Sequence, residues 1–319
     1  MSQKLTGVLV MAYGSPSTIN DLGSYYTHIR NGEPPTQALL DELHLRYLAI
    51  GNRSPLSQIT YRQAQSLAQY LNRSGVSASF KPYVGFKHTV PFIEDAVEAM
   101  HADGIQEAAA IVMSPHVTDY GPQPYMERAR RAARSVGGPR LVEVADWYRE
   151  PRFTAHWAGL IRDSLARMTA EEQRATAVIF SAHSLPRSLP VTDAYAERVR
   201  ESAERIAHAA GVERHALAWQ SAGRRPDPWL GPDIVSVTKD LWQRLKCRTF
   251  LYCPIGFAAD HLEVLYDNDI ECRALVERLG GRYLRPPMPN ASDSLIACLA
   301  DAVTHALEQK AVPERELQS

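Results

Sequence analysis

The stretch Phe257 to Cys272 reads FAADHLEVLYDNDIEC and directly follows an apolar run, Phe250 to Pro254, that is typical of a buried strand. Successive residues of an α-helix are rotated by about 100°, so four carboxylates of this stretch fall within an arc of roughly 80°. We call this set the acidic ladder; it consists of Asp260, Glu263, Asp267 and Glu271. Like charges four residues apart destabilise a helix by roughly 0.2–0.5 kcal/mol per pair, so the ladder requires a cation, a proton or a metal to offset it. The alternative is a solvated acidic face that begins with a capping box.

A histidine, His183, follows a second apolar run, Ala177 to Phe180. In parallel α/β sheets the residues beyond the carboxyl ends of the strands point into a shared crevice, so His183 and the acidic ladder are expected to face one another. Imidazole titrates near neutrality and carboxylates suit divalent cations. A histidine opposite a carboxylate ladder is therefore a candidate base or metal ligand, although a single histidine is usually structural.

The composition is that of a globular protein without a strongly charged partner. The 319 residues are 45% hydrophobic and 22% charged, and the formal net charge is −1. Lysine and arginine are scattered, which favours neither nucleic acid nor stable membrane association. The run Gly7 to Ala12 is too short for a signal peptide, and no run approaches the roughly 20 residues that span a bilayer. We expect a cytoplasmic protein.

The cysteines predict no disulfide framework and no zinc site. Cys247, Cys253, Cys272 and Cys298 form no C-x-x-C pair and show no zinc-like spacing. Free buried thiols are expected, and a cluster of four thiolates is the alternative.

Alternating apolar runs and amphipathic segments predict the α/β class with parallel sheets. The expected strands are 5–11, 79–84, 108–113 and 141–145, then 177–181, 215–220, 250–254 and 282–284. The expected helices are 61–72, 91–100, 126–135, 194–209, 235–245, 257–272 and 292–308. We infer two similar doubly wound, Rossmann-like lobes, 1–150 and 151–319, because Glu150-Pro151 interrupts the pattern.

The two halves resemble each other at their strand ends. AYGSP at 12–16 corresponds to AHSLP at 182–186, so Tyr13 and His183 occupy equivalent positions. This equivalence predicts that they lie on opposite walls of one cleft between the lobes. No G-x-G-x-x-G follows a strand and no P-loop is present, which disfavours nucleotide chemistry.

Residues 17–60 are polar, aromatic and interrupted by proline, as expected of a rim or lid. Tyr26 and Arg30 lie four apart on one helical face, and Arg46, Arg53 and Ser54 follow. Guanidinium binds carboxylate in a bidentate fork, so this rim suits carboxylate recognition. The alternative is an ordinary solvated surface.

Over nearly its whole length the chain resembles the ferrochelatases, which insert ferrous iron into a porphyrin. The resemblance is carried by motifs in order: MAYGSP (11–16), SPL (54–56), GFKH (85–88), SAHSLP (181–186), WQS (219–221), PWLGP (228–232) and DHLEVLYD (260–267). It implies that a porphyrin is clamped in the cleft between the lobes and that His183 and Glu263 are catalytic and handle the metal. It also implies a second divalent cation, such as Mg²⁺, at Asp267 and Glu271 on the acidic helix.

With a tyrosine in the Ala-Tyr-Gly turn, the chain resembles the coproporphyrin ferrochelatases of Gram-positive bacteria. This resemblance implies that Tyr13 can ligate iron in the product. The polar rim fits the four propionates of coproporphyrin. Asn31 stands where close relatives often have a second rim arginine, which puts one propionate contact in doubt. The implied substrate-binding residues are Tyr13, Tyr26, Arg30, Arg46, Arg53, Ser54, Lys87, His88 and Trp229.

The resemblance implies insertion of ferrous iron into coproporphyrin III to give coprohaem, without an organic cofactor. A downstream coprohaem decarboxylase and a monomeric state are expected. No iron–sulfur cluster is expected, because the sequence after Leu307 has no cysteine. The alternatives are a protoporphyrin IX ferrochelatase, a cobalt or sirohydrochlorin chelatase, and a haem or metal binding and delivery protein. Whether His183 acts as proton acceptor or iron ligand stays open.

Overall fold

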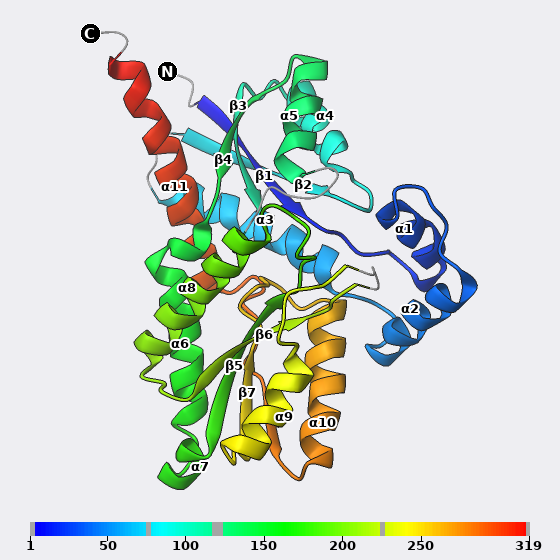
Figure 1. Ribbon diagram of the computed structural model, residues 1–319. Helices are drawn as coiled ribbons and strands as arrows, with labels where there is room; N and C mark the ends of the chain where they lie inside the picture. Colours follow the sequence, from blue (N-terminus) through cyan, green and yellow to red (C-terminus); the bar gives the residue numbers. More distant parts are fainter. Residues whose placement is uncertain (1–3, 75–77, 117–123, 224–226, 317–319) are drawn as a thin grey trace. The chain divides into compact units, whose positions relative to one another are not determined.

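The computed structural model describes residues 4–74, 78–116, 124–223 and 227–316, and it contains two four-stranded parallel sheets (Figure 1). The α/β class and the two similar lobes are confirmed. The first sheet consists of β1 (Lys4–Ala12), β2 (Ala78–Phe86), β3 (Glu107–Val112) and β4 (Arg140–Val144). The second consists of β5 (Thr176–His183), β6 (His215–Gln220), β7 (Thr249–Cys253) and β8 (Arg282–Leu284).

The two sheets have the same strand order, β2-β1-β3-β4 and β6-β5-β7-β8, and every paired strand is parallel. The direction of the connections reverses beside β1 in the first sheet and beside β5 in the second. A reversal of this kind leaves a crevice at the carboxyl ends of the strands, where doubly wound folds bind their ligands. A ligand site is therefore expected at the carboxyl ends of β1 and β5.

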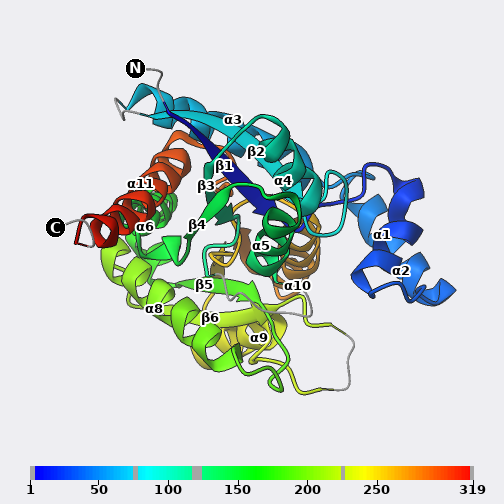
Figure 2. The ribbon, with the colours of Figure 1, turned by 90° about the horizontal axis from the view of Figure 1, so that it is seen from above.

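Helices cover both faces of the first sheet (Figure 2). One face carries α4 (Ile93–Ala102) and α5 (Tyr125–Val136), whose apolar residues pack on Leu9 and Met11 of β1. The other carries α3 (Leu56–Arg73) and α11 (Asp293–Glu316). Before α3 come the short η1 (Ile19–Asp21), α1 (Leu22–Ile29) and α2 (Gln37–Ala49).

The second sheet is covered in the same way. The helices are α6 (Pro151–Leu165), α7 (Ala170–Arg174), α8 (Thr192–Ala210), α9 (Ile234–Arg244) and α10 (Arg273–Arg278). A π-helix, η3 (Val264–Cys272), runs directly into α10. Its Cys272 joins Ile179, Phe250 and Tyr252 of the strands in one apolar core. Burial of each large side chain there contributes about 1.5–3 kcal/mol.

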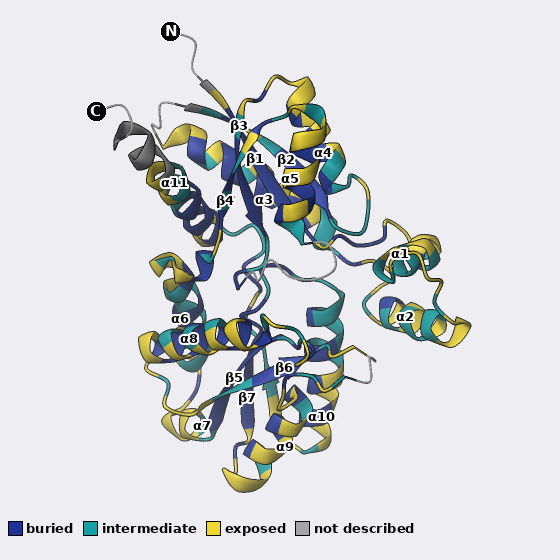
Figure 3. Cartoon of the chain, turned by 45° about the horizontal axis from the view of Figure 1, so that its top comes forward, coloured by how far each residue is buried: buried dark blue, intermediate teal, exposed yellow. Residues whose placement is uncertain are grey.

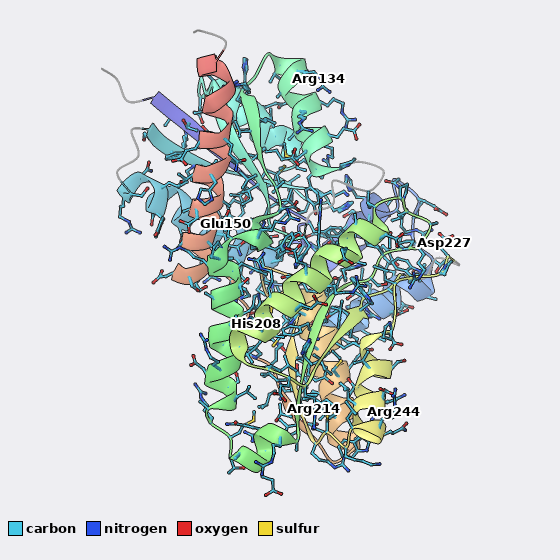
Figure 4. The ribbon with its side chains drawn as sticks, turned by 60° about the vertical axis from the view of Figure 1, so that its left-hand side comes forward. Arg134, Glu150, His208, Arg214, Asp227 and Arg244 are labelled. Atoms are coloured by element: carbon cyan, nitrogen blue, oxygen red, sulfur yellow. The ribbon has the colours of Figure 1, made fainter. Side chains whose placement is uncertain are left out.

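The chain divides into two units, and the division differs from the expected one at its C-terminal end. Unit 1 contains residues 1–150 and 289–319, and unit 2 contains residues 151–288. The assignment of 289–319 to the second lobe was wrong, because α11 packs against α3 and β4 of the first sheet. His305 of α11 also contacts Glu150, labelled in Figure 4, with 3.1 Å between Nδ1 and Oε1.

Three further features differ from the sequence-based expectation. Pro151 begins a helix, α6, because proline at the first helical position loses no hydrogen bond. Strand β5 runs on to His183 instead of ending at Ser181. The stretch Val264–Cys272 is a π-helix, so the α-helical period from which the acidic ladder was inferred was wrong there.

Burial separates the sheets from the rim. The strands of both sheets are mostly buried, whereas α1 and α2 are mostly intermediate or exposed (Figure 3). The four cysteines are free and buried, as predicted. Within the described residues, no helix is both long enough and apolar enough to cross a membrane.

Candidate active site

His183 is the last residue of β5, where it is in register with Gln220 of β6. Its ring Nδ1 lies 2.5 Å from the Ser184 carbonyl oxygen. A carbonyl can only accept, so Nδ1 carries a proton and the ring is fixed in orientation. The Tyr195 hydroxyl donates to the His183 carbonyl over 3.1 Å. Backbone and side chain are therefore both held, and Nε2 is left to face the acidic segment.

Glu263 lies between two imidazoles. Its Oε1 is 3.4 Å from Nε2 of His183, and its Oε2 is 3.5 Å from Nε2 of His261. His261 repeats the arrangement of His183, because its Nδ1 donates over 3.0 Å to a backbone carbonyl, that of Ala259. We call His183, Glu263 and His261 the His–Glu–His triad. The predicted pairing of His183 with Glu263 is thus present in unit 2.

His261 was missing from the sequence-based site. Residues two apart on a helix point in different directions, so the Asp-His-Leu-Glu motif gave no reason to place His261 beside Glu263. In the structure His261 precedes the helix, and its backbone is free of that constraint. The only signal was a histidine inside an acidic motif.

The triad strongly perturbs the titration of its members. Burial alone would lower the pKa of His183, but the charge of Glu263 and the hydrogen bond to it raise that pKa to about 9. Burial would raise the pKa of Glu263, yet the two histidines hold it far below its usual range. At neutral pH the pair is therefore an imidazolium and a carboxylate.

A glycine allows the segment after β7 to approach β5. A Cβ on Gly256 would lie 2.5 Å from Cβ of Ala182, the neighbour of His183. The Gly256 amide donates over 3.0 Å to the Ser181 carbonyl. The Ser181 hydroxyl in turn donates to the side chain of Gln220, which contacts the Glu263 carbonyl. The chain can reach His183 with the residues after Gly256 only because that position has no side chain.

The carboxylates of the acidic ladder have separate partners. Asp260 pairs with Arg285, 3.2 Å away. Asp267 is buried and accepts a hydrogen bond from Ser221, and Glu271 is exposed. A π-helix turns once in roughly 4.4 residues, so Asp267 and Glu271 still lie near one face. Arg285 is the cation that offsets Asp260, and the imidazolium of His183 offsets Glu263.

His183, Glu263 and His261 supply the imidazole and carboxylate donors that suit a ferrous ion. Within residues 4–74, 78–116, 124–223 and 227–316, no group of three or more His, Cys, Asp or Glu side chains is arranged to hold a metal.

Tyr13 directly follows β1, at the place in unit 1 that His183 occupies in unit 2. Its side chain is exposed, and its ring lies 4.4 Å from that of His88. Gly14 has a φ of +86°, and a Cβ there would lie 2.6 Å from Thr89. This turn is therefore possible only with glycine, and it presents the phenol at the strand end.

His88 forms a close pair with His28 of α1, with 3.0 Å between the two Nδ1 atoms. One ring must donate and the other accept, so the pair holds a single proton between the facing nitrogens. Burial, together with the charges of Lys87, His28 and Arg128, lowers the pKa of His88 to about 3. His88 is thus a neutral imidazole beside Tyr13.

The other predicted substrate-binding residues of unit 1 lie around these strand ends and on the rim. Arg30 and Arg46 pair with glutamates of their own segments, at 3.1 Å and 3.5 Å, and Arg53 is exposed. Ser54 is buried and accepts the Leu56 amide, which is a structural contact. Two further residues complete the set: Tyr26 is half-buried, and the Lys87 ammonium lies 5.1 Å from the Tyr125 ring.

Trp229 belongs to unit 2, in the segment that follows β6. Its indole packs on Gly223, where a Cβ would lie 2.8 Å from the ring. A backbone bridge joins it to Pro186, three residues after His183. Asp227, labelled in Figure 4, lies two residues before it. Trp229 is therefore anchored to the segment that carries His183.

The sequence matches the family model described as Ferrochelatase over residues 5–307. A coproporphyrin III ferrochelatase of Halalkalibacterium halodurans is 47% identical over 311 residues, which are 97% of this chain and 100% of that protein. The coproporphyrin III ferrochelatase of Bacillus subtilis is 47% identical, over 96% of this chain and 99% of that one.

Solved structures of other chelatases share the fold. The sirohydrochlorin chelatase SirB from Bacillus subtilis subspecies spizizenii, in complex with cobalt, has a TM-score of 0.56 at 12% identity and covers 96% of both chains. CbiX, described as the terminal enzyme of sirohaem biosynthesis in denitrifying bacteria, has a TM-score of 0.51 at 16% identity, over 94% of this chain and 99% of that one. These likenesses concern the architecture alone.

Proposed function

Because this chain belongs to the ferrochelatase family, we propose that it is a metal chelatase (a lyase) that inserts ferrous iron into coproporphyrin III to give coprohaem. The observation that carries the proposal is the His183–Glu263 pair, 3.4 Å apart at the end of β5, in a chain 47% identical to coproporphyrin III ferrochelatases. Both iron and the porphyrin are substrates.

Insertion requires two pyrrole protons to leave the porphyrin and the hydrated cation to lose water. His183 can accept a proton or bind iron only when its Nε2 is unprotonated. In the free protein Glu263 keeps that nitrogen protonated at neutral pH. The approach of a dication disfavours the imidazolium, so iron and proton exclude one another at this position.

Glu263 and His261 give the proton a path away from His183. The carboxylate contacts both imidazoles at about equal distances, 3.4 Å and 3.5 Å. A proton that leaves His183 Nε2 can pass to Glu263 and then to His261 Nε2, because both rings keep their Nδ1 protons on backbone carbonyls. We propose that this transfer resets His183 in every turnover.

The test is a comparison of ferrous insertion into coproporphyrin III and protoporphyrin IX by the purified protein. We expect faster turnover with coproporphyrin III, followed by the change in the visible spectrum on metallation. A preference for protoporphyrin IX, or for cobalt with sirohydrochlorin, would move the chain to another chelatase activity. Tight binding without turnover would instead make it a binding and delivery protein.

Arg30→Ala and Arg53→Ala are each expected to raise the KM for coproporphyrin about 5- to 10-fold while lowering kcat less, because each removes a charge-assisted contact made before and during the reaction. Steady-state kinetics at fixed ferrous iron measures both constants. Arg134→Ala is the control, because Arg134 is exposed on α5 (Figure 4). Unchanged KM in both rim variants would show that the rim is only a solvated surface.

Tyr13→Phe is expected to keep the fold and much of the insertion rate, but to alter the absorption spectrum of the ferric product complex and speed its release. Ferric iron favours a phenolate ligand, and phenylalanine cannot supply one. Spectra and release rates of the coprohaem complex test this. The same spectrum and release rate in wild type and variant would remove Tyr13 as the ligand and reopen the choice of porphyrin.

The remaining expectations stay proposals. A hydrated Mg²⁺ at Asp267 and Glu271 is supported by two carboxylates near one face of η3. The lack of an iron–sulfur cluster, the monomeric state, the cytoplasmic location and transfer of the product to a coprohaem decarboxylase also remain predictions.

A further inference from the structure

Arg285 lies one residue after β8, and its side chain is only 12% exposed. Its guanidinium forms a bidentate pair with Asp269: Nε donates to Oδ1 over 2.8 Å, and Nη2 donates to Oδ2 over 2.7 Å. Nη2 also donates to Asp260 over 3.2 Å, and Nη1 to the Pro286 carbonyl over 3.2 Å. One largely buried cation thus binds two carboxylates of the triad-bearing segment.

The two carboxylates flank the triad residues along the chain. Asp260 directly precedes His261 and Glu263, and Asp269 lies in the middle of η3. Arg285 therefore ties together both ends of a ten-residue stretch, 260–269, that contains two members of the triad. Either carboxylate could move away from the other without the arginine, because like charges repel.

A second layer holds Asp269 in place. The Tyr283 hydroxyl donates to Asp269 Oδ1 over 2.8 Å, and Arg273 donates to the Asp269 carbonyl over 3.0 Å. The Arg273 guanidinium also lies 4.7 Å from the centre of the Tyr283 ring. Asp269 is thus held in place by several contacts. Arg285, which is bound to Asp269, in turn holds Asp260 at the start of the stretch 260–269.

The backbone between the two anchors needs such support. A π-helix is rare in proteins and occurs mostly as short insertions at functional sites, because its geometry is intrinsically less favourable than that of an α-helix. Asn268 in its middle is completely buried, and within the described residues neither of its side-chain polar atoms has a hydrogen-bond partner. An unsatisfied buried amide destabilises the native state. Something outside η3 must therefore hold it.

We propose that Arg285 is a positioning residue for metal insertion: by clamping Asp260 to Asp269 across the π-helix, it keeps His261 and Glu263 within reach of His183. The inference rests on the proposed function of the triad. The carboxylates that Arg285 binds are those of Asp260 and Asp269 and not that of Glu263, so it acts on the triad through the backbone. The fork to Asp269 requires guanidinium, because a lysine ammonium is a single point charge.

The test compares Arg285→Ala and Arg285→Lys with Arg282→Ala. Arg282 lies three residues earlier, is half-exposed, and pairs with Glu172 at 3.1 Å, which makes it a matched control outside the segment. We expect Arg285→Ala to lower kcat about 10- to 100-fold while the KM for coproporphyrin stays within about twofold. Arg285→Lys should remain at least about fivefold below wild type, and millimolar guanidinium should partly restore Arg285→Ala but not Arg285→Lys. Arg282→Ala should match wild type.

A second readout does not depend on turnover. With ¹⁵N-labelled histidine, the imidazole resonances of His183 and His261 should shift in Arg285→Ala and stay unchanged in Arg282→Ala. If the resonances shift in Arg285→Ala but the wild-type protein inserts no iron, the clamp is supported and the proposed function is rejected. Unshifted resonances, or a kcat within about threefold of wild type, would overturn the clamp. Parallel changes in kcat and porphyrin KM that follow a fall in Tm would also overturn it, in favour of a purely structural role.

Discussion

Replacing His183 with alanine is expected to lower the rate of iron insertion by about 10²- to 10⁴-fold, the usual contribution of a positioned acid or base, while coproporphyrin still binds. We expect the imidazole to act on a proton or on iron and not on the propionates. The measurement is single-turnover metallation together with porphyrin titration by fluorescence quenching. Binding should stay within about threefold of wild type, because the rim that is expected to hold the propionates is unaltered in this variant.

The control for this variant is His208→Ala. His208 is an exposed histidine near the end of α8 in the same unit, and it is labelled in Figure 4. It should insert iron at the wild-type rate. If His183→Ala keeps more than about a tenth of wild-type turnover, the loss is under roughly 1.4 kcal/mol, and His183 is not the acting group.

The second large effect is expected for Glu263→Gln, which should lower kcat at least about 100-fold. A glutamine is similar in size but cannot stabilise the imidazolium of His183 or pass a proton to His261. The KM for coproporphyrin should change little, since the charged partners of Glu263 are the two histidines of unit 2. Glu277→Gln, an exposed residue of α10, is the control.

The shifted pKa values of His183 and Glu263 also predict that the stability of the protein depends on pH. The pKa of His183 in the folded protein, about 9, lies above its ordinary value of 6.5. The pair therefore stabilises the fold fully below about pH 6.5 and loses this contribution as the pH rises through about 9. Because the pKa of Glu263 is lowered, the stability that its carboxylate contributes is fully present above its ordinary pKa of 4.5. This contribution is lost only in stronger acid, as the pH falls through the lowered pKa.

The Tm of Glu263→Gln should accordingly fall furthest below that of wild type between about pH 5 and 6.5, and the gap should close above pH 9. Both side chains are about a third exposed, at 35% and 32%, so solvent screening limits the pair to roughly 1 kcal/mol. For a unit of this size, that corresponds to about 2–4 °C. Calorimetry at pH 6 and pH 10 measures it, and a gap that widens with pH would contradict the assignment.

The local order of the chain could be predicted from its sequence. The strands 215–220 and 282–284 were predicted at their observed bounds, because a short run with apolar residues between turn signals specifies a strand with little help from the rest of the chain. The strand-end position of His183 followed from the same logic. So did the pairing of His183 with Glu263, through the expectation that strand ends in such sheets share a crevice.

The local pattern was less informative where two structures fit one sequence. The segment 257–272 has an α-helical distribution of charges, yet Val264–Cys272 forms a π-helix. The fit of Cys272 into the apolar core, and the anchoring of Asp260 and Asp269, are tertiary contacts that no helical period contains. The C-terminal helix was assigned to the wrong unit for a related reason: its apolar face fits either sheet by composition, and packing against α3 and β4 decides between them.

The sequence by itself thus determined the α/β class, the repeated halves, and the residues His183, Glu263 and Tyr13 as the chemically distinctive strand-end and helix groups. Only the tertiary structure placed His261 on the second oxygen of Glu263 and Arg285 across Asp260 and Asp269. The physical reason is the range of each interaction. The periodicity of apolar residues and the turn signals depend on neighbours a few residues apart, so they can be recognised in the sequence. Arg285, in contrast, contacts Asp269 across 16 residues of chain and Asp260 across 25, and contacts at such separations exist only once the sheet has formed.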